Sequence, residues 1–332
     1  MKFNKESLKI DARLVSEQLA ETILKQVRVT LKKAGAVVGI SGGLDSSVVL
    51  ALCAKALGPD RVVGVMMPET DSSPDSQQLA QALADRFGVQ TVVENITPAL
   101  EGMGCYRRRD EAIREVFPEY DHTYKNKITI PTNILEKETF NFFTLTIENA
   151  AGETKSKRMP PSAYLKVVAA SNLKQRLRMT TLYYHAEERN YAVAGTGNKD
   201  EHCQGFFVKY GDGGADLKPI AHLFKVQIYQ LAEELGVPDE IIKRVPTTDT
   251  YSAGSTQEEF FFGLDFYRMD MLWYAMENGV PTDEAAKVMN LSEQQARRAY
   301  ANIQRKIDGT EYLRLPPLEV QSKQSGKSGK LM

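Results

Sequence analysis

The chain has 332 residues, of which 42% are hydrophobic and 26% are charged, a balance typical of a folded globular protein. Its 42 Lys and Arg residues nearly match its 43 Asp and Glu residues, so the net charge gives no reason to expect binding to nucleic acid or membranes. Three widely spaced cysteines exclude a disulfide framework and zinc-finger spacing. With no N-terminal apolar segment and no run of about 18 apolar residues, the sequence predicts a cytoplasmic protein.

The first third of the chain alternates helical and β patterns. Apolar residues recur at helical spacing over residues 12–33, and a β-rich run follows at 36–40. The next predicted elements are a helix over 48–57, a strand over 61–67, a helix over 75–87 that stops at Gly88, and a strand over 89–96. This alternation predicts an α/β fold with a doubly wound parallel sheet and helices on both faces.

Residues 121–161 interrupt the alternation. Residues that favour β-structure cluster over 127–130 and 142–148, and Ala151-Gly152-Glu153 has the composition of a turn. We therefore predict a small β-hairpin insertion over 121–161.

The helical pattern resumes over 162–188, and a strand over 191–194 leads into the loop 195–198. A helix is predicted over 225–235, and the segment 257–306 is mostly helical in pattern. The last residues are rich in Ser, Gly and Lys and cannot bury a core. These patterns predict one domain over 1–320, with a helical part over 257–315, and a disordered tail over 321–332.

A glycine-rich string lies between the first predicted strand and the helix after it, and reads Ser41-Gly42-Gly43-Leu44-Asp45-Ser46-Ser47. Two glycines allow a tight turn whose backbone N–H groups line an anion site, and the following helix adds the positive end of its dipole. The serines supply hydroxyl donors to phosphate oxygens. An aspartate beside phosphates is unfavourable alone, but it is expected if it holds Mg²⁺.

Two other phosphate-binding motifs are excluded at this turn. No G-x-x-x-x-G-K-[ST] string is present, and no G-x-G-x-x-G string follows the first strand. The string is similar to the signature Ser-Gly-Gly-x-Asp-Ser of the PP-loop ATP pyrophosphatases, which cleave ATP to AMP and pyrophosphate. That motif alone leaves open several enzymes, among them GMP, asparagine, argininosuccinate and NAD synthetases and tRNA-thiolating enzymes.

A second constellation narrows the choice. Residues 195–201 read GTGNKDE and residues 205–216 read GFFVKYGDGGAD, a pattern that resembles the signature of the ammonia-dependent NAD synthetases. Matching residues also occur at 172–176 and 246–249. The resemblance implies an adenine nucleotide alpha-hydrolase-like fold and an amide ligase that converts deamido-NAD and ammonia to NAD. It further implies an acyl-adenylate intermediate and release of AMP and pyrophosphate.

The resemblance also implies residue roles by position. Asp45, Glu201 and Lys225 would be catalytic, with Mg²⁺ held by Asp45 and Glu201. The residues implied to contact ATP are Ser41, Gly42, Gly43, Leu44, Asp45, Ser46, Ser47, Thr196, Lys225 and Thr247. Those implied to bind deamido-NAD, partly across a homodimer interface, are Asn172, Arg176, Lys209 and Asp216.

Several of these residues also have simpler interpretations. Arg176 and Lys209 could be solvated surface charges, and Asp216 could cap a turn. The sequence also departs from the family near its end, where Tyr312-Leu313-Arg314 has leucine in place of a lysine that helps to bind the dinucleotide. A related carboxylate substrate therefore remains an alternative.

The chain length favours free ammonia as the nitrogen donor. The residues that match the ligase pattern span most of the chain, which leaves too few for a glutaminase domain. Cys203, beside His202, is the only cysteine near a candidate base, and it lies inside the ligase string. A glutaminase in a separate subunit remains an alternative source of ammonia. Another alternative is a nucleic-acid binder, because residues 282–306 resemble a helix–turn–helix with Arg297, Arg298, Arg305 and Lys306 on its second helix.

Overall fold

The parallel sheet predicted from the sequence forms the centre of the molecule. The structure is a computed structural model that describes residues 2–130, 134–135, 143–247 and 251–319. The strands are β1 (Ala36–Gly39), β2 (Val62–Met66), β3 (Gln90–Val93) and β7 (Ala192–Ala194). They lie in the order β3-β2-β1-β7, and all three pairings are parallel.

Alternate side chains of the sheet face two different helical layers. On β1, Ala36 and Val38 contact one hydrophobic cluster, whereas Val37 contacts another on the opposite face. The first cluster is covered by α1 (Ala12–Lys25), α2 (Leu44–Leu57), α3 (Pro74–Phe87) and α8 (Lys225–Leu235). The second is covered by α6 (Pro161–Arg189). Successive side chains of the strands thus point to opposite faces of the sheet, and both faces are covered by helices. The prediction of a doubly wound parallel sheet is confirmed.

The strand order determines where a ligand can bind. The chain runs outward from β1 to β2 and β3, then returns to place β7 on the other side of β1. The carboxyl ends of β1 and β7 thus lie side by side at the point where the winding reverses, which is where open α/β sheets bind ligands. The loops that follow these strands, 40–43 and 195–198, contain both glycine-rich motifs.

The insertion forms a second sheet, which has one more strand than a hairpin. Its strands are β4 (Lys125–Thr129), β5 (Thr144–Glu148) and β6 (Thr154–Arg158), antiparallel in the order β4-β5-β6. We call β4–β6 the insertion sheet. The predicted strand over 142–148 begins at residue 142, which lies outside the described residues. Two short helices missing from the sequence prediction, α4 (Thr97–Gly102) and α5 (Cys105–Arg114), precede the insertion sheet.

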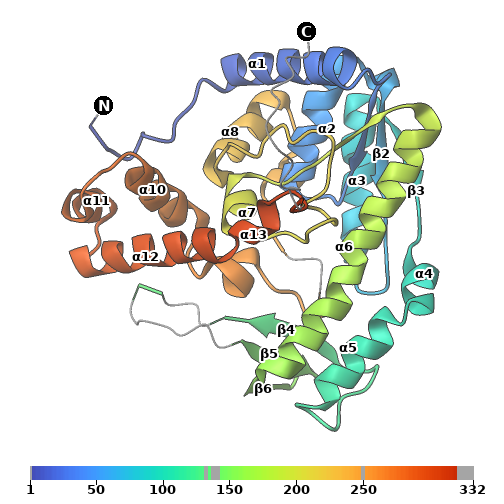
Figure 1. Cartoon of the computed structure of the whole chain (residues 1–332), viewed down its shortest axis with the longest axis vertical. Coiled ribbons are helices and arrows are strands. Elements are labelled where there is room, and N and C mark those ends of the chain that lie inside the picture. The colour runs from blue at the N-terminus through green and yellow to red at the C-terminus, as the bar shows by residue number, and fades with distance from the viewer. Residues whose placement is uncertain (1, 131–133, 136–142, 248–250, 320–332) are drawn as a thin grey trace, which may run out of the picture.

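Helix α6 joins the two sheets. Figure 1 shows it running from the parallel sheet, beside β2 and β3, down to the insertion sheet. Its start packs in the insertion core through Ala163 and Val167, and its end packs on the parallel sheet through Leu182 and Ala186.

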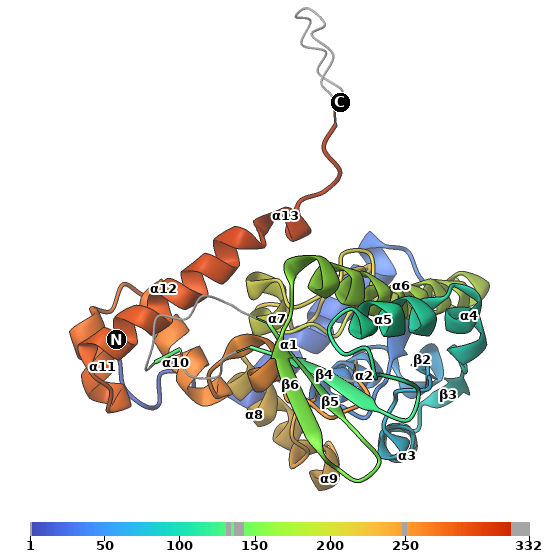
Figure 2. The same ribbon diagram turned by 90° about the horizontal axis from the view of Figure 1, so that it is seen from below.

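The C-terminal helices pack together beside the sheet (Figures 1 and 2). Helices α10 (Phe266–Glu277), α11 (Thr282–Met289) and α12 (Glu293–Gly309) share one hydrophobic cluster, which contains the fully buried Trp273. The short helix α13 (Glu311–Arg314) follows α12. The predicted tail over 321–332 lies outside the described residues.

Several boundaries differ from the sequence prediction. The helix predicted over 12–33 ends as α-helix at Lys25 and continues as one π-helical turn, η1 (Gln26–Thr30), before Lys32 adopts a φ of 54°. The other short elements are η2 (Pro59–Arg61), α7 (Lys199–Gln204), α9 (Asp239–Ile242) and the π-turn η3 (Glu258–Phe262). In the described part of the chain, no helix is both long and apolar enough to cross a membrane.

Candidate active site

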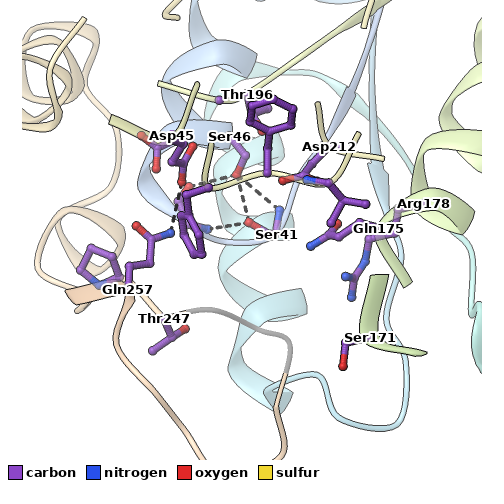
Figure 3. A pocket seen from close by; sticks show the side chains of 18 of the residues that line it. Ser41, Asp45, Ser46, Ser171, Gln175, Arg178, Thr196, Asp212, Thr247 and Gln257 are labelled. Atoms are coloured by element: carbon purple, nitrogen blue, oxygen red, sulfur yellow. Dashed lines mark hydrogen bonds between the residues drawn. The ribbon is translucent and has the colours of Figure 1, made fainter. Parts of the chain in front are cut away.

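A cavity of about 670 Å³ opens at the carboxyl ends of β1 and β7. Its walls come from the loops after these strands, from the middle of α6, and from residues 244–247 and 257–261. Figure 3 shows Asp45, Ser46 and Thr196 on one side of this pocket, with Thr247 and Ser171 on the opposite side.

The glycine-rich turn has the geometry of an anion site. Gly42 adopts a φ of +70°, and a Cβ there would lie 2.6 Å from the carbonyl oxygen of Ser76, so only glycine fits. The N–H of Gly43 points to the Ser41 hydroxyl at 3.3 Å, and helix α2 begins at Leu44 with no side-chain cap. The first N–H groups of α2 therefore have no side-chain cap, and the residues that carry them line the cavity, an arrangement suited to binding an anion.

Asp45 is held by two residues from distant parts of the chain. The ammonium of Lys225, the first residue of α8, forms a close ion pair with Oδ2 of Asp45. The side-chain amide of Asn198 donates to Oδ1 at 2.9 Å. The Lys225 side chain is only 1% exposed, and its backbone N–H donates to the buried Asp200 at 3.0 Å. Burial disfavours the charged ammonium, but Asp45 and Glu201 outweigh it, so the pKa of Lys225 is raised.

Glu201 lies beside this ion pair because of a helix cap. Asn198 is the N-cap of α7, and its side chain accepts from the N–H of Glu201 while its own N–H donates to Glu201 Oε2 at 3.2 Å. The second oxygen, Oε1, accepts from the amide of Gln257 at 3.3 Å. Burial and then repulsion by Asp45 raise the pKa of Glu201 to about 8.

The donor set fits a magnesium ion. Within the described residues, no cluster of three or more His, Cys, Asp and Glu side chains could hold a metal. Mg²⁺ does not require such a cluster, because it keeps several waters and binds through one or two carboxylates and substrate phosphates. Asp45 and Glu201 provide those two carboxylates beside the glycine-rich turn. Burial and then repulsion by Asp45 raise the pKa of Glu201, and a divalent cation would relieve that repulsion.

The structure brings most of the predicted ATP contacts to one cavity. Its lining includes Ser41, Gly43, Leu44, Asp45, Ser46, Thr196, Glu201, Lys225 and Thr247. Two predicted contacts are not in the lining. Gly42 is buried in the turn itself, and the fully buried Ser47 donates its hydroxyl to the carbonyl of Gly43 at 2.8 Å, which closes the first turn of α2.

Of the residues predicted to bind deamido-NAD, only Asn172 lines the cavity. Arg176 donates to the backbone carbonyl of Lys209 at 3.3 Å, and the Lys209 ammonium donates to the carbonyl of Leu315 at 2.9 Å. Asp216 accepts from the backbone N–H of Val193 at 2.8 Å. Within this chain, these three side chains stabilise the surroundings of the pocket rather than forming its wall.

Other lining residues were missed by the sequence analysis. They are Gln175, Arg178, Arg244 and Gln257, together with Asn198, which fixes the carboxylates from just behind the wall. Arg244 donates to the carbonyl of Gly42 at 3.3 Å and to the hydroxyl of Ser76 at 3.0 Å. Two of these residues had a sequence signal. Gln175 lies in the matching segment 172–176, and Asn198 lies three residues before Glu201, which is a capping-box pattern.

Comparisons with known proteins agree with this geometry. The family model for NAD synthase matches residues 15–116 and 108–317. The chain is 48% identical over 311 residues to the NH(3)-dependent NAD(+) synthetase of Mesorhizobium japonicum, covering 94% of this chain and 97% of that relative. The chain belongs to the NAD synthase family. The curated relatives in this family are NH(3)-dependent NAD(+) synthetases, which are ligases.

Solved structures share the fold of this NAD synthase family member. The NH3-dependent NAD synthetase from Campylobacter jejuni matches with a TM-score of 0.59 and 21% identity, over 94% of this chain and 100% of that chain. The NMN synthetase from Francisella tularensis matches with a TM-score of 0.59 and 20% identity, over 95% and 100% respectively. At these identities, the likeness concerns the fold alone.

The C-terminal departure from the NAD synthase pattern lies at the pocket. Tyr312 and Leu313 are both in the lining. Arg314 anchors them, because its guanidinium donates to the carbonyls of Cys203 at 2.7 Å and Ile307 at 2.8 Å. The apolar side chain of Leu313 therefore lies at the pocket, at the position where the resemblance led us to expect a lysine.

Several further features singled out in the sequence have structural roles in this member of the family. The thiol of Cys203 packs on the C-terminal cluster, and burial raises its pKa, which is unfavourable for a nucleophile. On α12, Arg297 pairs with Glu293 at 2.5 Å, and Arg298 donates to the carbonyl of Leu135 at 3.0 Å. Lys306 donates to the carbonyl of Phe261 at 2.7 Å. These basic groups are engaged within the chain.

Proposed function

We propose that this chain is an ammonia-dependent NAD synthetase that uses ATP and Mg²⁺ to convert deamido-NAD to NAD. The activity of its family is the synthesis of NAD from deamido-NAD with ammonia and ATP. The observation that supports the proposal most is the convergence of Asp45, Glu201 and Lys225 on one cavity at the glycine-rich turn. Residues 1–320 would act as the single catalytic domain.

The glycine-rich turn would bind the phosphates of ATP. Its N–H groups, the start of α2 and the hydroxyls of Ser41 and Ser46 supply donors, and Thr196 and Thr247 lie on opposite sides of the same cavity. A carboxylate oxygen of the substrate attacks the α-phosphorus, and pyrophosphate leaves. The carboxylate, a poor electrophile, thereby becomes an acyl-adenylate.

Lys225 would stabilise the negative charge that develops on the departing pyrophosphate. Its ammonium stays charged because of Asp45, and its buried stem restricts it to one orientation. Asp45 and Glu201 would hold Mg²⁺, which when bound neutralises phosphate charge. Asn198 orients both carboxylates, and Gln257 orients Glu201. Ammonia then attacks the acyl carbon, its nitrogen releases one proton to solvent, and AMP leaves with the electron pair of the C–O bond.

The acid substrate would bind along α6, where Asn172, Gln175 and Arg178 line the cavity. Arg176, Lys209 and Asp216 lie off this wall, so a role for them in binding deamido-NAD would require a second copy of the chain. We propose a homodimer for this reason. The exposed face of α6 offers apolar contacts for it, since Leu165 is 64% and Tyr184 61% exposed.

Free ammonia would be the nitrogen donor, since the raised pKa of Cys203 makes it a poor glutaminase nucleophile. A glutaminase supplied by a separate chain remains compatible with the site. The proposal includes a cytoplasmic location, for which the support is the composition, including three cysteines without disulfide spacing.

A steady-state assay tests the proposal. Purified protein with ATP, Mg²⁺, deamido-NAD and ammonium should release AMP and NAD in equal amounts. Parallel reactions replace ammonium by glutamine and deamido-NAD by nicotinate mononucleotide or simple carboxylates. If another acid is turned over and deamido-NAD is not, that acid is the substrate and the proposal of deamido-NAD is wrong. If no acid leads to release of AMP, the proposal that the protein is a ligase is wrong.

A further inference from the structure

Strand β4 of the insertion sheet and the residue that follows it form backbone hydrogen bonds with a segment outside the insertion. We call residues 251–262 the pocket segment. The N–H of Ala253 donates to the carbonyl of Asn126 at 3.0 Å, and the N–H of Ile130 donates to the carbonyl of Glu259 at 3.1 Å. The insertion sheet is therefore bonded near both ends of the pocket segment.

A side-chain contact strengthens the first of these attachments. The hydroxyl of Ser252 accepts from the backbone N–H of Asn126 at 3.0 Å and from its side-chain amide at 3.2 Å. Asn126 is fully buried, and its amide also donates to the hydroxyl of Tyr120 at 2.8 Å. Such a buried polar group fixes its partners, because any displacement leaves donors unpaired.

Apolar contacts hold the same end of the segment. Tyr251 is 5% exposed and belongs to the hydrophobic core of the insertion sheet, with Ile128, Leu145 and Val167. Its ring also packs on Phe260 of the pocket segment, with centroids 5.5 Å apart. One residue of the pocket segment is thus buried in the core of the insertion.

The other contacts of the pocket segment are at the active site. Thr256 pairs with Thr247, which is a predicted ATP contact. Gln257 donates to Glu201, and its own N–H donates to the carbonyl of Pro246 at 3.1 Å. Phe260 and Phe261 line the cavity.

We propose that the insertion sheet clamps the pocket segment against the active site, with Asn126 and Ser252 as positioning residues for ATP binding. This inference rests on the proposed function, and it assigns a role to the insertion. Residues 251–255 form no helix or strand of their own, so their order depends on contacts from outside. The insertion sheet supplies those contacts. The ordered segment then fixes Thr247 through its pairing with Thr256, and it fixes Glu201 through the hydrogen bond from Gln257.

The test removes one hydroxyl. In Ser252→Ala, Asn126 loses the acceptor of two of its hydrogen bonds. We expect the dissociation constant for MgATP, measured by calorimetry without acid substrate, to rise about five- to ten-fold, as expected for the loss of one or two hydrogen bonds. The KM for ATP should rise by a similar factor while kcat changes less than about two-fold, and Ser252→Thr, which keeps the oxygen, should restore both.

The matched control is Ser156→Ala. Ser156 lies in the same sheet, on β6, and its hydroxyl bonds only to Thr146 at 2.8 Å among the described contacts. This variant should bind MgATP as the unmodified protein does. An equal loss of affinity in both variants would show that any weakening of the insertion sheet has this effect, and it would overturn the clamp.

Hydrogen exchange separates this inference from the proposed function, because it requires no turnover. Peptides that cover residues 251–262 should exchange at least about five-fold faster in Ser252→Ala, with Tm within a few degrees of the unmodified protein. Unchanged exchange would overturn the clamp even in an active NAD synthetase. Faster exchange with weaker MgATP binding, in a protein that makes no NAD, would support the clamp and reject the substrate proposal.

Discussion

The side-chain amide of Asn198 donates a 2.9 Å hydrogen bond to the carboxylate of Asp45, across 153 positions of sequence. The backbone N–H of the same residue donates to Glu201 at 3.2 Å. Asn198 therefore sets the position of one carboxylate relative to the other. It touches neither substrate in the proposed mechanism, so it is a positioning residue.

Replacement of Asn198 should weaken metal binding more than it weakens folding. In Asn198→Ser the cap of α7 is retained, but the amide that holds Asp45 is lost. We expect the Mg²⁺ concentration for half-maximal activity to rise about 10- to 100-fold, the usual effect of removing a group that orients a metal ligand. Ser292→Ala removes the N-cap of the remote α12 and should leave the Mg²⁺ dependence unchanged.

Loss of the Lys225 ammonium should slow the adenylation step. Lys225→Met keeps most of the buried stem but removes the charge beside the phosphates. We expect kcat for pyrophosphate release to fall about 10²- to 10³-fold, as for other preorganised donors to a developing charge. Near-normal pyrophosphate release, in a variant with normal circular dichroism, would exclude Lys225 from the catalytic group.

The raised pKa of Glu201 predicts how stability depends on pH in the metal-free protein. The native state keeps a proton on Glu201 between its ordinary pKa of 4.5 and about 8, whereas the unfolded chain has lost it. This contribution to stability is complete below pH 4.5 and is lost as pH rises to about 8. Urea unfolding in EDTA between pH 5 and 8.5 should show this decline, and Glu201→Gln should reduce it. Equal slopes in the two proteins would contradict the assignment.

Gly205 should be intolerant of any side chain. It has a φ of +78°, and a Cβ there would lie 2.3 Å from Thr310, which precedes the anchored C-terminal turn at the pocket. Gly88 is the matched control, because it has the same left-handed conformation (φ 66°, ψ 27°) and the atom nearest to its Cβ position, Cβ of Pro59, is 3.9 Å away. We expect Gly88→Ala to cost about 1 kcal/mol and Gly205→Ala about 3 kcal/mol or more in the free energy of unfolding. Equal losses of stability in the two variants would mean that Thr310 and α13 move away from the new Cβ at little cost, and would contradict this prediction.

The sequence predicted the part of the site that lies in contiguous motifs. The turn at 41–46 and Glu201 each follow a strand of the central sheet, so their convergence could be expected from the winding alone. Arg244 and Gln257 could not be predicted in this way. They lie on irregular segments whose path depends on tertiary contacts, including those made by the insertion sheet.

The missed elements have physical reasons as well. Strand β6 reads TKSKR and is exposed at every position, so no alternation of apolar and polar residues marks it. Helix α5 reads CYRRRDEAIR, and its buried positions include Arg109, which forms an ion pair with Asp71 rather than packing as an apolar residue. Hydrophobic periodicity is therefore a weak signal for a strand that is exposed throughout and for a helix that buries a charged side chain among apolar ones.

Helix α6 has 29 residues and packs on the central sheet at one end and on the insertion core at the other. At about 1.5 Å per residue it is a single rod of roughly 40 Å with pocket residues near its middle. Melting either end would expose apolar surface at the other, so the two sheets should denature in one cooperative transition. An insertion attached in this way is a thermodynamic part of the enzyme rather than an independent module.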